Sequence, residues 1–143
     1  MDLGGARQLT DLIIAGTAED LVNKGGLTEM VLGWELVKYN NPRSQHDLYY
    51  WENTADGTRS EVDYIIARDM QVLPIECKSG TSGKMKSLHM FMRYKHLTNA
   101  IRCSLENFAL LESNDKQDNG ALRQISIIPL FAISNLYSAF QVM

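Results

Sequence analysis

Three β-rich runs lie close together in the middle of the chain and constrain its fold more than any other feature. They cover residues 48–51, 61–67 and 71–78. The turn-forming segment 53–57 separates the first two runs, and the short segment 68–70 separates the last two. Short connections of this composition are typical of antiparallel hairpins. The sequence therefore predicts a three-stranded antiparallel meander.

Helical periodicity predicts helices on both sides of this meander. Apolar residues recur at helical spacing over 27–37, and again over 85–92 after a break rich in glycine and serine. A fourth strand is expected over 100–105, an exposed polar loop over 114–120 and a last buried strand or strand-turn over 125–133. This order predicts an α/β fold in which helices cover a mixed sheet.

The first part of the chain is expected to form a helical lead-in, residues 1–23. Thr17 and Asp20 have the spacing of a capping box, which predicts a helix start at this point. The whole chain, residues 1–143, is long enough for one compact core, and its hydrophobic content of 45% favours a globular domain. We therefore expect a single domain.

Charge is distributed unevenly along the chain. The net charge at pH 7 is −3, so nothing marks the whole molecule as a general binder of polyanions. Residues 68–102 nevertheless hold seven basic residues against two acidic ones, a surplus of +5, which leaves −8 for the remainder. This asymmetry permits a local surface that faces phosphate groups. A solvated helix face explains it equally well.

Cysteine usage and hydropathy indicate a protein of the reducing cytoplasm. Cys77 and Cys103 lie in apolar stretches without C-x-x-C spacing, so neither a zinc knuckle nor a disulfide framework is predicted. The longest apolar runs are shorter than the ~18 residues that span a bilayer, and no signal peptide is recognisable at the N-terminus. We expect a cytoplasmic protein that is not membrane-bound.

The strongest chemical pattern lies at the end of the third β-rich run. Side chains alternate along a strand, so Glu76 and Lys78 project to the same face, together with Pro74. Proline cannot donate to the strand ladder, and a bulge or a free edge is therefore expected at that position. An E-x-K tripeptide is common by chance, and such a pair on an exposed strand is often a simple ion pair.

Asp63 on the preceding strand makes this pattern more specific. Val62, Tyr64 and Ile66 suit a buried face, which assigns Asp63 to the opposite one, and a short hairpin would bring it beside Glu76. Two neighbouring carboxylates repel each other unless a cation lies between them. Oxygen ligands favour Mg²⁺ or Mn²⁺ over zinc. With an ammonium group to orient a metal-activated water, this set predicts a site for phosphodiester hydrolysis.

Taken together, these segments resemble a known family: the PD-(D/E)XK nuclease-like domain of unknown function at the C-terminal end of bacterial and archaeal AAA+ type ATPases. The resemblance covers most of the chain. The segments that carry it are KGGLTEMVLGWEL at 24–36, LYYW at 48–51, EVDYII at 61–66, LPIECKSG at 73–80, KSL at 86–88 and IPL at 128–130.

The resemblance implies a restriction-endonuclease-like fold and a role for each of four residues. Glu29 corresponds to the acid of the first helix, Asp63 to the acid of the second motif, and Glu76 and Lys78 to the E-x-K pair. Asp63, Glu76 and Glu29 would then hold Mg²⁺ or Mn²⁺. The family's ATPase module carries a phosphate-binding loop that this chain lacks, so the chain resembles a detached C-terminal module that works with an ATPase in the same or a companion chain.

Two hypotheses follow for the function. The first is a metal-dependent nuclease-like domain that acts on nucleic acid, with DNA as the expected substrate. The second is a catalytically inactive module that binds DNA or protein within an ATPase assembly and keeps the acid–lysine cluster as a structural network. The basic residues after the E-x-K strand would contact phosphate groups under either hypothesis, and they are Lys84, Lys86, Arg93 and Lys95.

Overall fold

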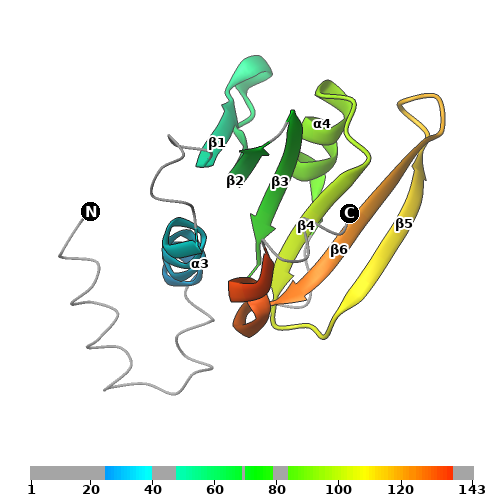
Figure 1. Ribbon diagram of the computed structural model, residues 1–143. Coiled ribbons are helices and arrows are strands. Elements are labelled where there is room, and N and C mark those ends of the chain that lie inside the picture. Colours follow the sequence, from blue (N-terminus) through cyan, green and yellow to red (C-terminus); the bar gives the residue numbers. More distant parts are fainter. Residues whose placement is uncertain (1–24, 40–47, 69, 79–83, 137–143) are drawn as a thin grey trace.

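The computed structural model describes residues 25–39, 48–68, 70–78 and 84–136 (Figure 1). The expected capping-box helix and the 1–23 lead-in lie outside these residues. The elements in chain order are α3 (Gly25–Tyr39), β1 (Leu48–Asn53), the 3₁₀ turn η1 (Ala55–Gly57), β2 (Ser60–Arg68), β3 (Gln71–Cys77), α4 (Lys86–Tyr94), β4 (Asn99–Ser104), β5 (Ala109–Asp115), β6 (Ala121–Pro129) and the 3₁₀ segment η2 (Leu130–Asn135).

Six strands form one mixed sheet in the order β1-β2-β3-β4-β6-β5 (Figure 1). The pairs β1–β2 and β2–β3 are antiparallel, which confirms the predicted meander. The pairs β3–β4 and β4–β6 are parallel, and β6–β5 is antiparallel again. Parallel neighbours need a crossover connection, and α4 provides the one between β3 and β4. The predicted α/β fold with a mixed sheet is thus confirmed.

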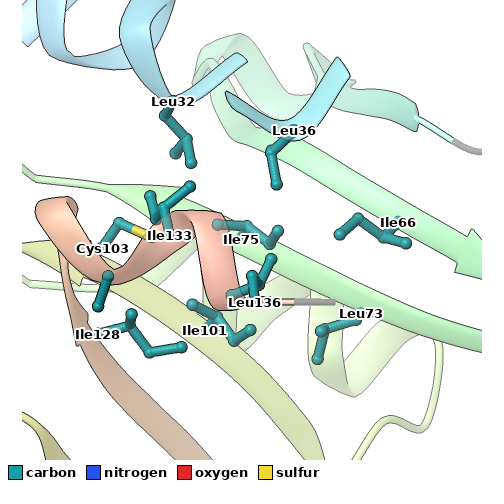
Figure 2. Close-up of a cluster of buried hydrophobic side chains, with 11 residues drawn as sticks. Leu32, Leu36, Ile66, Leu73, Ile75, Ile101, Cys103, Ile128, Ile133 and Leu136 are labelled. Atoms are coloured by element: carbon teal, nitrogen blue, oxygen red, sulfur yellow. The ribbon is translucent and has the colours of Figure 1, made fainter. Parts of the chain in front are cut away.

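Helices cover both faces of this sheet, and each face has its own hydrophobic core. One core joins α3 and η2 to the sheet, and Figure 2 shows Leu32 and Leu36 of α3 directed toward it. Its strand residues include Ile66, Leu73 and Ile75. The other core lies under α4, where the buried residues are Val62, Ile65, Leu88, Phe91, Met92, Ala100 and Ile125.

A β-bulge in β2 overturns one prediction about side-chain direction. Tyr49 of β1 pairs with Ile65, but Trp51 pairs with Val62, so β2 holds one residue more than β1 over this stretch. The extra residue shifts the alternation of side chains. Val62 therefore packs under α4, whereas Tyr64 packs on the α3 side. The expectation that both share one buried face was wrong.

The third strand, β3, tolerates its proline because Pro74 lies before the point where pairing with the parallel neighbour β4 begins. Pro74 pairs with Ile65 of β2, but the parallel pairing with β4 begins only at Ile75. Proline has no N–H group, and at this position β3 has no paired neighbour on its β4 side. The expected bulge occurs in β2 rather than at Pro74, whereas the alternative of a free edge at Pro74 matches the missing neighbour on the β4 side.

Strand β5 was not predicted from the sequence. Every residue of Ala109–Asn114 is exposed, so the strand has no buried face that would produce an alternating pattern. It exists because it pairs with β6 along its whole length, from Ala109 opposite Ile127 to Asp115 opposite Ala121. The predicted polar loop shortens to the hairpin turn between them.

None of the helices in the described residues is long and apolar enough to cross a membrane.

Candidate active site

Asp63 lies in the β2 bulge, where the backbone ladder between β2 and β3 stops. The last residues paired at this end are Tyr64 and Ile75. Beyond them, Oδ2 of Asp63 accepts a 2.6 Å hydrogen bond from the backbone N–H of Cys77. A hydrogen bond from an amide to an ionised carboxylate is short and strong. The bulge and this bond together hold Asp63 against the end of β3.

Glu76 and Lys78 form an ion pair beside it. Oε1 of Glu76 lies 2.5 Å from Nζ of Lys78, and the side chains are 5% and 35% exposed. The pair therefore reaches from the interior to the surface. The second carboxylate oxygen of Glu76, Oε2, is buried and has no hydrogen-bond partner among the described residues. Leaving a buried charged acceptor unsatisfied is costly. This oxygen is therefore suited to act as a ligand of a bound cation.

Glu29 reaches this region because α3 approaches β2 closely. The Tyr64 hydroxyl donates a 3.0 Å hydrogen bond to the backbone carbonyl of Glu29. One turn further along α3, Gly33 leaves room for the Tyr64 ring, since a Cβ at this position would lie 2.9 Å from Cζ of Tyr64. The phenol thus fixes the helix that carries Glu29 against the strand that carries Asp63.

The acidic groups of the site influence one another's ionisation. Burial raises the pKa of Asp63, and the negative charge of Glu76 adds to this effect, while the Cys77 N–H group opposes it. Burial also raises the pKa of Glu29, and repulsion from Asp63 contributes. Both effects disfavour the ionised carboxylates. The site therefore carries more negative charge than its surroundings stabilise, a condition that a bound cation would relieve.

Lys78 is held in its charged form by these acids. Burial alone lowers the pKa of its ammonium group, but the hydrogen bond with Glu76 and the charges of Glu76 and Asp63 outweigh burial and raise it. Lys78 is therefore protonated at neutral pH and cannot act as a base. Its available role is to donate hydrogen bonds and to offset negative charge.

Arg102 is a site neighbour that the sequence analysis did not identify. It is buried in β4, and it pairs in parallel register with Glu76, so the two side chains leave the sheet on the same face. Its Nη2 lies 3.5 Å from Oε2 of Glu106. Its positive charge opposes, without reversing, the rise in the pKa of Lys78. In the sequence, Arg102 contributed only to the basic surplus, because its position beside Glu76 depends on the parallel pairing.

Cys77 lies between Glu76 and Lys78 but is not a candidate nucleophile. Its side chain packs on the α3 side of the sheet, away from that pair. Burial, with the nearby charge of Asp63, raises the pKa of the thiol to about 12. The reactive form of cysteine is the thiolate, which is scarcely populated at neutral pH under these conditions.

The donor set suits a magnesium ion that uses few protein ligands. No three His, Cys, Asp or Glu side chains within the described ranges are grouped so that they could hold an ion together. Magnesium is usually bound through one or two carboxylates, with waters and substrate phosphates as further ligands. Asp63 and Glu76, with the unsatisfied Oε2 of Glu76, fit this mode. Glu29 is coupled to Asp63 electrostatically and would act in the surrounding shell.

The basic residues predicted to contact phosphate groups divide into two sets. Lys84, Lys86 and Arg93 line one surface pocket at α4. Arg93 is also held by Asp115, through distances of 3.1 Å from Nε to Oδ2 and from Nη2 to Oδ1. Lys95 is not among the residues that line this pocket, and its Nζ lies 5.0 Å from the centre of the Tyr94 ring.

The comparisons with known proteins give one family match. Residues 24–131 match the model of a family described as a domain of unknown function, DUF4143. The match runs from the start of α3 into η2 and includes Glu29, Asp63, Glu76 and Lys78. A search of curated proteins found no match.

Proposed function

The chain belongs to the DUF4143 family of domains of unknown function, and from its candidate site we propose that it is a metal-dependent nuclease-like domain acting on DNA. The proposal includes the finer fold assignment, a restriction-endonuclease-like PD-(D/E)XK core. The observation that carries it is the unsatisfied, buried Oε2 of Glu76 at the strand end to which the Asp63 carboxylate is bonded.

Each of the four residues has a distinct role in this proposal. Asp63 and Glu76 would hold the Mg²⁺ or Mn²⁺ ion. A bound ion of this kind polarises a phosphodiester and lowers the pKa of water. Lys78 is protonated, and it would orient the attacking water and offset the negative charge that develops on the phosphate group. Glu29 would support the metal or its water shell from α3.

A second candidate function is favoured by one specific observation. Glu76 and Lys78 are paired at 2.5 Å, so each already neutralises part of the other's charge. A catalytically inactive module that binds DNA or protein could keep such a pair as part of its structure. Under this alternative the carboxylates would neither bind metal nor support cleavage.

The resemblance to the C-terminal module of AAA+ type ATPases adds a proposed partner. The domain would receive its substrate through an ATPase module in the same or a companion chain. Co-purification of this chain with AAA+ type ATPases of the same cell, before and after ATP addition, tests that association independently of cleavage.

The nuclease proposal is tested by cleavage of plasmid and single-stranded DNA with Mg²⁺ or Mn²⁺. The variants are Asp63→Asn, Glu76→Gln and Lys78→Ala, with Glu112→Gln as a control that removes a carboxylate from the remote strand β5. We expect metal-dependent cleavage by the wild type and the control, and a loss of roughly 100-fold or more in each site variant. If a site residue has only a structural role, its substitution would lower the stability of the protein instead. Each variant is therefore also checked by thermal unfolding.

Two outcomes would count against a nuclease. Cleavage that persists in EDTA points to a contaminant. Site variants as active as the wild type would show that cleavage does not take place at this site. If no variant or condition gives cleavage, metal titration separates the alternatives further. Mg²⁺ or Mn²⁺ should raise the unfolding temperature of the wild type and leave that of Asp63→Asn unchanged.

A further inference from the structure

A surface pocket lies between α4 and the β5–β6 turn, apart from the residues assigned to metal binding. Its volume is about 540 Å³, within the range of small-ligand sites. One wall comes from the segment that begins α4, and the other includes Gln117 of the hairpin turn. The polar residues around it are Lys84, Lys86, His89, Arg93 and Gln117.

The uncompensated positive charge of the pocket is concentrated on two lysines. Arg93 is neutralised by Asp115, to which it is bonded twice. Lys84 and Lys86 are exposed and have no carboxylate within salt-bridge distance in the part of the chain that the structure describes. Arg59, by contrast, is paired with Glu52 and Glu61. An anion is therefore the natural complement of this pocket.

The start of α4 adds to the positive potential. The helix begins at Lys86, and Met85 at the N-cap position provides no side-chain acceptor. The first N–H groups of a helix have no partner within the helix and carry partial positive charge, which favours anions nearby. His89, in the first turns of α4, and Gln117 supply further groups that can hydrogen-bond to the oxygens of an anion.

The chain itself limits how far this pocket can lie from the candidate active site. Lys84 follows Lys78 by six residues, and an extended chain covers at most about 3.6 Å per residue, so the two backbones are separated by no more than about 22 Å. A nucleic-acid strand carries a phosphate group about every 3.4 Å along the helix axis. A strand that is bound at Lys78 and continues toward α4 would therefore present phosphate groups within reach of Lys84 and Lys86.

We propose that this pocket binds a backbone phosphate of the nucleic-acid strand whose neighbouring segment occupies the Asp63–Glu76–Lys78 site. The inference rests on the proposed function for its ligand, but it concerns binding rather than cleavage. Lys84 and Lys86 would provide the charge, and His89 and Gln117 the hydrogen bonds. The pocket would thus fix where the strand lies relative to the metal-binding carboxylates.

Binding is measured by fluorescence anisotropy with labelled single-stranded and duplex 20-nucleotide probes, in EDTA so that cleavage does not interfere. The test variant is the double substitution Lys84→Gln and Lys86→Gln. The control is Lys38→Gln with Arg59→Gln, which removes the same charge from two residues that do not line the pocket. We expect the Kd of the test variant to rise about 10-fold. The slope of log Kd against log salt concentration should fall by about 0.7 to 0.9, the value for one lost phosphate contact. The control should stay close to the wild type.

A competition with inorganic phosphate and deoxynucleoside monophosphate, at constant ionic strength, distinguishes a strand phosphate from a free one. Thermal stabilisation by these small anions that depends on Lys84 and Lys86, with unchanged probe affinity in the double variant, would overturn the strand proposal in favour of a small phosphate ligand. Equal losses of probe affinity in the test and control variants would show general charge attraction only. That result would overturn the proposal that the pocket binds a strand phosphate.

These results separate the pocket from the nuclease proposal. If cleavage depends on Asp63 and Lys78 while the double variant binds and cleaves like the wild type, the pocket inference is wrong and the function stands. If no cleavage occurs but probe binding requires Lys84 and Lys86, the pocket stands and the catalytic proposal fails. Unfolding curves of the double variant confirm that these exposed substitutions leave the fold intact.

Discussion

Asp63 owes its position to a backbone irregularity together with one hydrogen bond. The bulge in β2 interrupts the alternation of the strand, and the carboxylate then bonds to the N–H group of Cys77. Bulges commonly redirect a side chain beside a functional site. Burial and the neighbouring Glu76 raise the pKa of Asp63, so its ionised form is held at a cost to stability. Such a cost is typical of functional sites, which are rarely optimised for stability alone.

Asp63→Asn should therefore stabilise the metal-free protein. The amide oxygen can still accept the hydrogen bond from Cys77, while the charge that Glu76 and Glu29 repel is removed. We expect a rise of about 4 °C or less in the unfolding temperature at pH 7, with EDTA present. The folded pKa of Asp63 is raised, so the difference should shrink as the pH falls and Asp63 becomes protonated. A large loss of stability at pH 7 would show that the charge itself supports the fold.

At the scale of elements, the contact between α3 and β2 brings the acids of two segments together. Tyr64 bonds to the Glu29 carbonyl and fills the space that Gly33 leaves open. Leu32 and Leu36 of the same helix are buried in the core on this face (Figure 2). The helix therefore has little freedom to move away from the strand. A side chain at the glycine position has to displace the Tyr64 ring.

Gly33→Ala should lower stability by about 1–3 kcal/mol, because the added Cβ overpacks the Tyr64 ring. The matched control is Gly26→Ala in the same helix, where a Cβ meets nothing within 4 Å. Alanine is the better helix former, so the control should be neutral or stabilising by about 0.5–1 kcal/mol. Both are measured by chemical denaturation.

A double-mutant cycle identifies the contact responsible. In a Tyr64→Phe background the hydroxyl is gone, so Gly33→Ala should cost less than it does in the wild type. Equal costs in the two backgrounds, or equal effects of Gly33→Ala and Gly26→Ala, would contradict the proposed close approach.

Across the whole molecule, a polar network connects α4 to the far edge of the sheet. Asp115 at the end of β5 bonds to Arg93 of α4, and Arg123 of β6 lies 3.6 Å from the same carboxylate. Arg123 also pairs with Asp118 of the hairpin turn and donates to the Leu97 carbonyl. The side chain of Arg123 is 3% exposed. A buried guanidinium needs such partners, so these contacts tie the hairpin to the rest of the fold.

Asp115→Asn should lower the unfolding temperature, because two arginines lose their shared counter-charge. Hydrogen bonding from Arg93 lowers the pKa of Asp115 in the folded protein. A carboxyl group with a lowered pKa stabilises the fold fully above its unfolded pKa of about 3.9, and this contribution disappears as the pH falls through the folded value. The difference between wild type and variant should therefore be constant above about pH 5 and shrink below about pH 4.

Thermal unfolding from pH 7 to pH 3 measures this dependence. The control is Glu112→Gln on the same strand, which bonds only to Gln124 among the described residues and is exposed. Its effect should be small throughout. A difference for Asp115→Asn that persists unchanged at pH 3 would rule out the carboxylate as its cause.

The sequence by itself determined the features that depend on local pattern. Three β-rich runs joined by short turns can form only close antiparallel neighbours, and the two-residue period of a strand places Glu76 and Lys78 on one face. Apolar residues at helical spacing likewise located α3 and α4. These signals are strong because each is repeated several times within one element, and the core clusters of both sheet faces depend on them.

The tertiary structure decided what depends on contacts between distant segments. The exposed strand β5 forms only because it pairs with β6, and the β2 bulge becomes visible only in register with β1. Arg102 lies beside Glu76 because β3 and β4 run parallel. In each case the local sequence is compatible with more than one arrangement. The free energy of pairing and burial with the other segment selects one of them.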